Sequence, residues 1–140
     1  MDKEKVVVRF IDGKMVKGYI VKFSPSDREI IVENLSNQKE SINMAELKAI
    51  FFVRTFEGDR DHIETKSFLG TVPRGKRIFV RFRDGEAMTG FVEGDIPWQR
   101  GFFLESSKSS GFFLIPVDYH SNNIKVFVIS DAVRDVTVMG

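Results

Sequence analysis

Apolar and polar residues alternate near the start of the chain in a pattern that predicts a curved antiparallel hairpin. The even-numbered positions of residues 6–11 are valine, valine and phenylalanine, which share one face of an extended strand. Asp12 and Gly13 follow, and this pair favours a tight type I′ turn because both residues adopt positive φ at little cost. Residues 15–23 resume the apolar pattern as the return strand. Gly18 inside that strand indicates a bulge or a bend.

The next thirty residues continue with short strand signals and one helical turn. Residues 29–35 and residues 41–44 are two short strand-like segments. Residues 45–48 are good helix formers, and Asn43 before them is a suitable N-cap, so one helical turn is expected there. Residues 49–56 form an apolar last strand. This order, five short strands with a helical turn before the last, is typical of small SH3-like barrels, which close to bury their apolar faces.

The hairpin pattern returns 72 residues later. When residues 8–33 are compared with residues 80–105 without a gap, nine of the 26 pairs are identical. The identical pairs include the turn residues Asp12 and Asp84, as well as their following glycines. Self-similarity at a fixed spacing indicates an internal duplication.

The duplication predicts an all-β protein of two tandem five-stranded SH3-like or Sm-like barrels, each with a short helical turn before its last strand. We expect the first barrel at residues 1–58 and the second at residues 77–140. Residues 59–76 are a charged, turn-rich linker that can supply an extra strand. Each barrel builds its core from few residues, near the lower limit for independent stability.

In the second copy, the strand order of the first copy and the local strand-like segments predict where the later strands lie. The third strand is expected at residues 102–105 and the fourth at residues 112–116. The last strand of the barrel is expected at residues 124–130, after a less helical turn at residues 117–123. Residues 131–139 are expected to add one further short strand.

The composition disfavours catalytic and metal-binding functions. The chain has no cysteine and only two histidines, His62 and His120, so the usual ligands for a transition metal and the usual base for a nucleophilic serine are scarce. We therefore expect a protein that is not an enzyme and has no cofactor. The start of the chain is charged and no apolar segment is long enough to span a membrane, which favours a cytoplasmic protein without a membrane partner.

The charge is nearly balanced in both copies. Residues 1–56 carry ten lysines and arginines against eight acidic residues, and residues 77–140 carry seven against eight. A non-specific nucleic-acid binder normally has a marked positive surface. Any such role here must depend on a local cluster.

The second copy offers the clearest local cluster of candidate binding residues. Strand alternation places Arg77, Arg81 and Arg83 on the outward face of the strand that begins the copy. Trp98 and Arg100 lie in the turn at residues 95–101, after the second strand of the copy, at positions where the first copy has Ser26 and Arg28. These residues can bind a phosphate backbone or an acidic partner. The alternatives are a solvated strand face paired with acidic neighbours and a tryptophan that covers its own barrel.

The residues also resemble a known family. The pattern Val8-Arg9-Phe10, Asp12-Gly13 and Gly18-Tyr19 resembles the first motif of Sm-like small barrels. The first copy and its ending, residues 47–58, resemble an uncharacterised family of bacterial Sm-like or SH3-like domains. The resemblance implies the barrel fold and supplies no activity. The RNA-binding motifs of Sm proteins are not matched, because Ser24 follows the aromatic of the bent strand and no glycine follows Arg54.

Three functions follow from these observations. The first is a non-catalytic binding or regulatory module that acts through protein–protein interaction, with an unidentified protein partner and possible oligomerisation. The second is RNA binding through the basic face of the second barrel. The third, which ranks last, is binding of a small ligand or nucleotide in a groove between the barrels.

Overall fold

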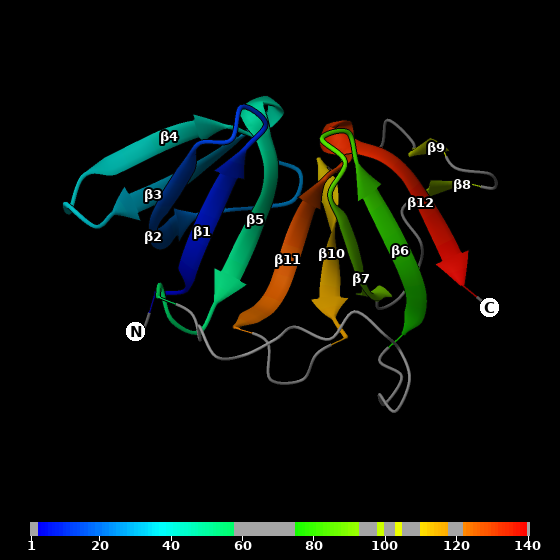
Figure 1. The fold of residues 1–140 in the computed structure, drawn as a ribbon. Helices are drawn as coiled ribbons and strands as arrows, with labels where there is room; N and C mark the ends of the chain where they lie inside the picture. The colour runs from blue at the N-terminus through cyan, green and yellow to red at the C-terminus, as the bar shows by residue number, and fades with distance from the viewer. Residues whose placement is uncertain are drawn as a thin grey trace.

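The computed structural model describes residues 3–57, 75–92, 98–99, 103–104, 110–117 and 122–139, and Figure 1 shows their arrangement. The predicted linker, residues 59–76, lies outside this part of the chain except for its last two residues. Within the described part the protein is all β, with two short 3-10 turns.

Each half of the chain contributes five strands and one 3-10 turn to the main sheet. The first half contains β1 (Lys5–Phe10), β2 (Met15–Lys22), β3 (Glu29–Asn34), β4 (Lys39–Asn43), η1 (Met44–Glu46) and β5 (Leu47–Val53). The second half contains β6 (Lys76–Phe82), β7 (Ala87–Val92), β10 (Gly111–Pro116), β11 (Asn123–Ile129), η2 (Ser130–Ala132) and β12 (Val133–Met139). Two strands of two residues each, β8 (Trp98–Gln99) and β9 (Phe103–Leu104), pair only with each other.

The ten longer strands form one open antiparallel sheet in the order β12-β6-β7-β10-β11-β5-β1-β2-β3-β4. The all-β prediction is confirmed, but the sheet does not show the predicted division into two closed barrels, because β5 pairs with β11 and joins the halves. Within each half, the strand that follows the 3-10 turn lies beside the first strand of that half. Figure 1 shows β5 and β11 at the centre, with β4 and β12 at the outer edges.

The strands predicted at residues 112–116, 124–130 and 131–139 are confirmed as β10, β11 and β12, but their places in the second half differ from the prediction. The predicted third strand at residues 102–105 corresponds to β9, which is not part of the main sheet. The third, fourth and last strands of the half are β10, β11 and β12, and the helical turn is η2 rather than residues 117–123. The reason is an insertion: η1 and η2 begin 86 residues apart, at Met44 and Ser130, whereas the hairpins are 72 residues apart.

Both hairpins use a three-residue loop in place of the predicted two-residue type I′ turn. Gly13 N–H donates to the carbonyl of Phe10 at 3.1 Å, and Gly85 N–H donates to the carbonyl of Phe82 at 3.0 Å. Both glycines have positive φ, +93° and +94°, whereas the aspartates before them do not. This is a tight turn closed by a left-handed glycine, a common three-residue hairpin. The aspartate side chain stabilises each loop by accepting the N–H two residues ahead, at 2.9 Å.

Gly18 and Gly90 permit close approach between strands. A Cβ on Gly18 would overlap the carbonyl oxygen of Glu33 in β3, and a Cβ on Gly90 would overlap Leu114 and the carbonyl of Ile115 in β10. The bulge predicted at Gly18 lies slightly later, where the register between β2 and β3 shifts after Ile20.

The two halves place their cores on opposite faces of the continuous sheet. Residues that face each other across an antiparallel ladder point to the same side. Val8 and Ile50 therefore share one face, which carries the core of the first half. Phe51, Val126 and Leu114 share the other face, and the ladders through β7 place the buried residues of β6 there as well. All seven residues of β5 are consequently buried, because each half covers one face of this strand.

Candidate functional site

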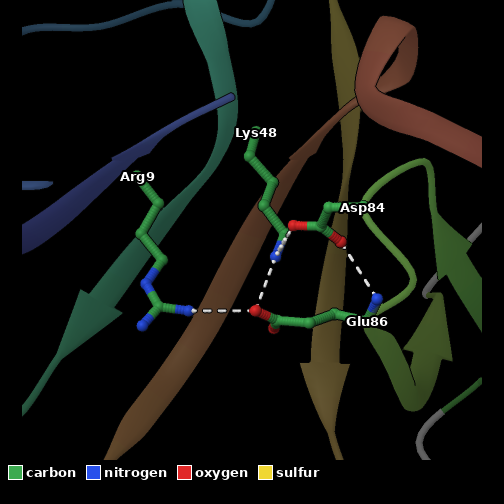
Figure 2. A network of polar contacts seen from close by, with 4 residues as sticks. All are labelled: Arg9, Lys48, Asp84 and Glu86. Atoms are coloured by element: carbon green, nitrogen blue, oxygen red, sulfur yellow. Dashed lines mark hydrogen bonds and ion pairs between the residues drawn. The ribbon is translucent and has the colours of Figure 1, made fainter. Parts of the chain in front are cut away.

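Lys48 is the one charged residue that is buried in the described part of the chain, with 5% of its surface exposed. It lies at a bulge near the start of β5. Arg9 pairs with Ala49 and Phe10 with Leu47, so Lys48 is left between the two pairs. A bulge redirects a side chain relative to strict alternation. In Figure 2, the side chains of Lys48 and Arg9 extend toward the same turn of the second half.

The hairpin turn between β6 and β7 brings two carboxylates to these cations (Figure 2). Lys48 Nζ lies 2.7 Å from Asp84 Oδ2 and 3.0 Å from Glu86 Oε1. Arg9 Nη1 lies 3.8 Å from the same Glu86 oxygen. The network therefore connects β1 and β5 of the first half to the first turn of the second half. We call these four residues the junction cluster.

Aromatic rings flank both cations of the junction cluster. Lys48 Nζ lies 4.8 Å from the ring centroid of Phe82, and Arg9 Cζ lies 5.5 Å from that of Phe51. These distances are in the range of cation–π attraction. Each cation is thus held between a carboxylate of the second half and an aromatic ring.

The junction cluster lowers the pKa of Asp84. The hydrogen bond from Lys48 is the largest cause, followed by the bond from the backbone N–H of Glu86. The charges of Lys48 and Arg9 lower the pKa further, while slight burial opposes them. Asp84 is therefore ionised at neutral pH and neutralises the buried ammonium.

The chemistry of the junction cluster is that of a closed ion-pair network. A buried ammonium is costly unless it is paired and hydrogen-bonded, and Asp84 and Glu86 meet that need. No buried side-chain nitrogen or oxygen lacks a hydrogen-bond partner in the described residues. Those residues also contain no group of three or more His, Asp or Glu side chains able to hold a metal ion. The cluster fixes the two halves to each other.

A second contact between the halves lies on the opposite face of the sheet. Phe23 and Phe52 of the first half pack against Phe113 and Phe127 of the second, with ring centroids 5.0–6.1 Å apart. Lys125 Nζ lies 4.7 Å and 5.1 Å from the rings of Phe52 and Phe113. Such aromatic pairs stabilise beyond their area burial, by about 1 kcal/mol each.

Two of the predicted binding residues share an exposed strand face. Arg77 and Arg81 are exposed, and Ile78 and Val80, which lie between them in the sequence, are buried. The predicted alternation of β6 is therefore confirmed. Phe79 lies on the arginine face, and its ring centroid is 5.8 Å from Arg81 Cζ.

The other three predicted residues do not join this face. Arg83 lies in the turn after β6, and its Nε donates to the carbonyl of Asp131 at 2.8 Å. The backbone of Trp98 belongs to β8, but its side chain is outside the described part of the chain. Arg100 lies outside the described residues altogether.

The sequence reasoning missed the junction cluster. One signal was present: Lys48 interrupts an otherwise apolar run from Leu47 to Val53. In a strand that is buried on both faces, such a lysine requires a carboxylate partner. Asp84 was recognised only as a turn residue, which it also is.

Comparison with known proteins gives a family and no function. No curated protein matches the chain, and no solved structure matches it. No helix in the described residues is long and apolar enough to cross a membrane. The model of one family, described as a family of unknown function (DUF6982), matches residues 2–140, and the chain therefore belongs to that family.

Proposed function

We propose that the protein is a non-catalytic, cytoplasmic binding or regulatory module that acts through protein–protein interaction. The observation that carries this proposal is that the buried charge of Lys48 is paired with Asp84 and Glu86. The junction cluster therefore serves to hold the two halves together. In the described residues, polar side chains outside the junction cluster lie on exposed strand faces and on the outer strands β4 and β12. Outer strands can add a strand from a partner.

The proposal includes a tandem duplication of an Sm-like or SH3-like small barrel. It is supported by the matching strand order of the halves, by the paired hairpin loops with left-handed glycines, and by a 3-10 turn before the last strand of each. In this view the halves have opened toward each other, and pairing of β5 with β11 replaces closure of each barrel.

Photocrosslinking in cells tests the interaction function. A photoreactive amino acid is placed at Thr137 on β12, at Lys39 on β4 or at Val21 on β2, all of which are exposed. We expect a discrete protein adduct from at least one position and not from all three. Absence of protein adducts at every position would contradict the proposal.

RNA binding is the second candidate function, and the outward row of exposed Arg77, half-buried Phe79 and exposed Arg81 favours it. Arginines with an interleaved aromatic suit single-stranded nucleic acid. Fluorescence anisotropy with a labelled single-stranded RNA pool, repeated over a range of salt, tests it. RNA binding predicts an affinity that falls steeply with salt and that Arg81→Ala weakens. Flat anisotropy at low salt would remove this candidate.

A further inference from the structure

The second half contains a counterpart of the cationic part of the junction cluster. In the strand order, β6 occupies the place of β1, and β12 occupies the place of β5. Arg81 of β6 is 72 residues after Arg9, and Arg134 of β12 is 86 residues after Lys48, which are the spacings of the hairpins and of the 3-10 turns. Both cations of the junction cluster thus have an arginine in the corresponding place.

The backbone geometry of the two places agrees. In the first half, the register shifts at Lys48, between the pairs that Ala49 and Leu47 make with β1. In the second half, the register shifts at Arg134, between Asp135 paired with Arg81 and Val133 paired with Phe82. The bulge that turns Lys48 toward Arg9 is therefore repeated at Arg134 beside Arg81.

The counterpart differs in that no turn covers it in the described residues. The Arg134 side chain is 66% exposed, and within the described residues it forms an ion pair with the adjacent Asp135, at 3.9 Å. Arg81 is exposed and lies against the ring of Phe79. The two arginines and Asp135 together carry one net positive charge. Phe79 offers an apolar contact where β1 has Val7.

We propose that Arg81, Arg134 and the ring of Phe79 form a docking site for an acidic β-turn of a partner protein. The proposal deepens the protein–protein function proposed above and rests on it. The junction cluster shows how a turn can be bound by two cations. Its carboxylates, Asp84 and Glu86, flank a glycine and contact cations on two adjacent strands. Arginine suits such a role because its planar group can bind a carboxylate through two parallel hydrogen bonds.

A second copy of this chain is the less suitable occupant. Its corresponding turn carries Asp12 and Gly13 but has Lys14 where Glu86 stands. In the docked geometry Lys14 would approach Arg81, and two like charges would face each other. The site therefore favours a different protein whose turn carries two carboxylates.

A fluorescence-anisotropy titration tests the proposal. The probe is a labelled hairpin with the sequence of residues 80–89 and one cysteine added at each end, cyclised by the disulfide between the two cysteines. The receptor is the full chain at low salt. We expect saturable binding that Arg81→Ala and Arg134→Ala each weaken by about threefold to fivefold, the range of an exposed charge pair. The matched control is Arg77→Ala, an exposed arginine of the same strand face, which leaves binding unchanged. A probe with Asn and Gln in place of Asp84 and Glu86 binds more weakly.

Three results would overturn the proposal. The first is absence of binding, and the second is an equal loss with Arg77→Ala, which would mean attraction by general charge. The third is self-association of the unaltered chain that Asp12→Asn abolishes in sedimentation velocity, which would make a second copy the occupant. A failed titration together with protein crosslinks at Lys39 or Val21 would reject this site and leave the proposed function standing.

Discussion

At the residue scale, the junction cluster shows how a buried charge is tolerated. Lys48 is almost entirely inaccessible, whereas the side chains of Asp84 and Glu86 are 44% and 58% exposed. The carboxylates can be solvated if the lysine is removed, but the lysine cannot be solvated if the carboxylates are removed. Removing the two carboxylates is therefore expected to destabilise the protein more than removing the lysine.

This asymmetry predicts the outcome of a mutant series. The double variant D84N/E86Q leaves an unpaired buried ammonium, and we expect its free energy of unfolding to fall by about 3 kcal/mol. Adding Lys48→Met, which keeps the volume and removes the charge, should restore most of this loss. Urea unfolding of the three variants measures it. A Lys48→Met single variant as unstable as D84N/E86Q would contradict the interpretation.

The lowered pKa of Asp84 predicts a pH dependence. A carboxyl group with a lowered pKa in the folded state contributes stability that is complete above its unfolded pKa of about 4 and is lost as the pH falls through the folded value. We expect the stability difference between the wild type and Asp84→Asn to be largest above about pH 5 and to shrink below about pH 4. Urea unfolding of both proteins across that interval measures it, and a difference independent of pH would refute it.

At the element scale, the two hairpin turns have the same backbone and different surroundings. Gly13 and Gly85 share nearly the same positive φ, and a Cβ on either would meet no atom within 4 Å. The intrinsic cost of alanine should thus be the same in both, about 1–2 kcal/mol. The turn of Gly85 additionally positions two carboxylates for Lys48.

We therefore expect Gly85→Ala to destabilise the protein more than Gly13→Ala does. The loss of stability in Gly13→Ala reports the backbone strain alone. The additional loss in Gly85→Ala reports displacement of the turn from the junction cluster. Thermal unfolding of both variants supplies the comparison. Equal losses would show that the junction cluster accommodates a shifted turn.

At the scale of the whole molecule, the halves share a sheet and contact each other on both of its faces. The ladder between β5 and β11, the junction cluster and the aromatic contact around Phe23 all cross the boundary. Removing the second half would expose the face of β5 that it covers. The two halves are thus expected to depend on each other for stability.

Calorimetry tests this dependence. We expect one cooperative unfolding transition, with equal calorimetric and van't Hoff enthalpies. Ile50→Ala in the first half and Val80→Ala in the second remove fully buried methyl groups, and each should lower the temperature of that single transition. Two separate transitions, with each variant shifting only one, would mean that the halves unfold independently.

The sequence by itself determined the local elements. Alternation correctly predicted the buried and exposed positions of β6, and the spacing of Asp-Gly pairs correctly predicted two hairpins. These features depend on neighbours within a few residues, where side-chain period and turn chemistry decide the conformation. Local patterns also located β10, β11 and β12, but their order in the half was assigned wrongly because residues 102–105 were counted as its third strand. The insertion that changes the spacing from 72 to 86 residues was not visible in those patterns.

The tertiary structure decided how the strands are joined and what Lys48 contacts. Two closed barrels and one open sheet satisfy the same alternation, since a strand edge can pair with either half at similar local cost. The choice between them depends on the apolar area buried on both faces of β5 and β11. The open sheet brings four residues together from distant segments: Arg9, Lys48, Asp84 and Glu86. Only the packed sheet could therefore show that one polar residue in an apolar strand links the two halves.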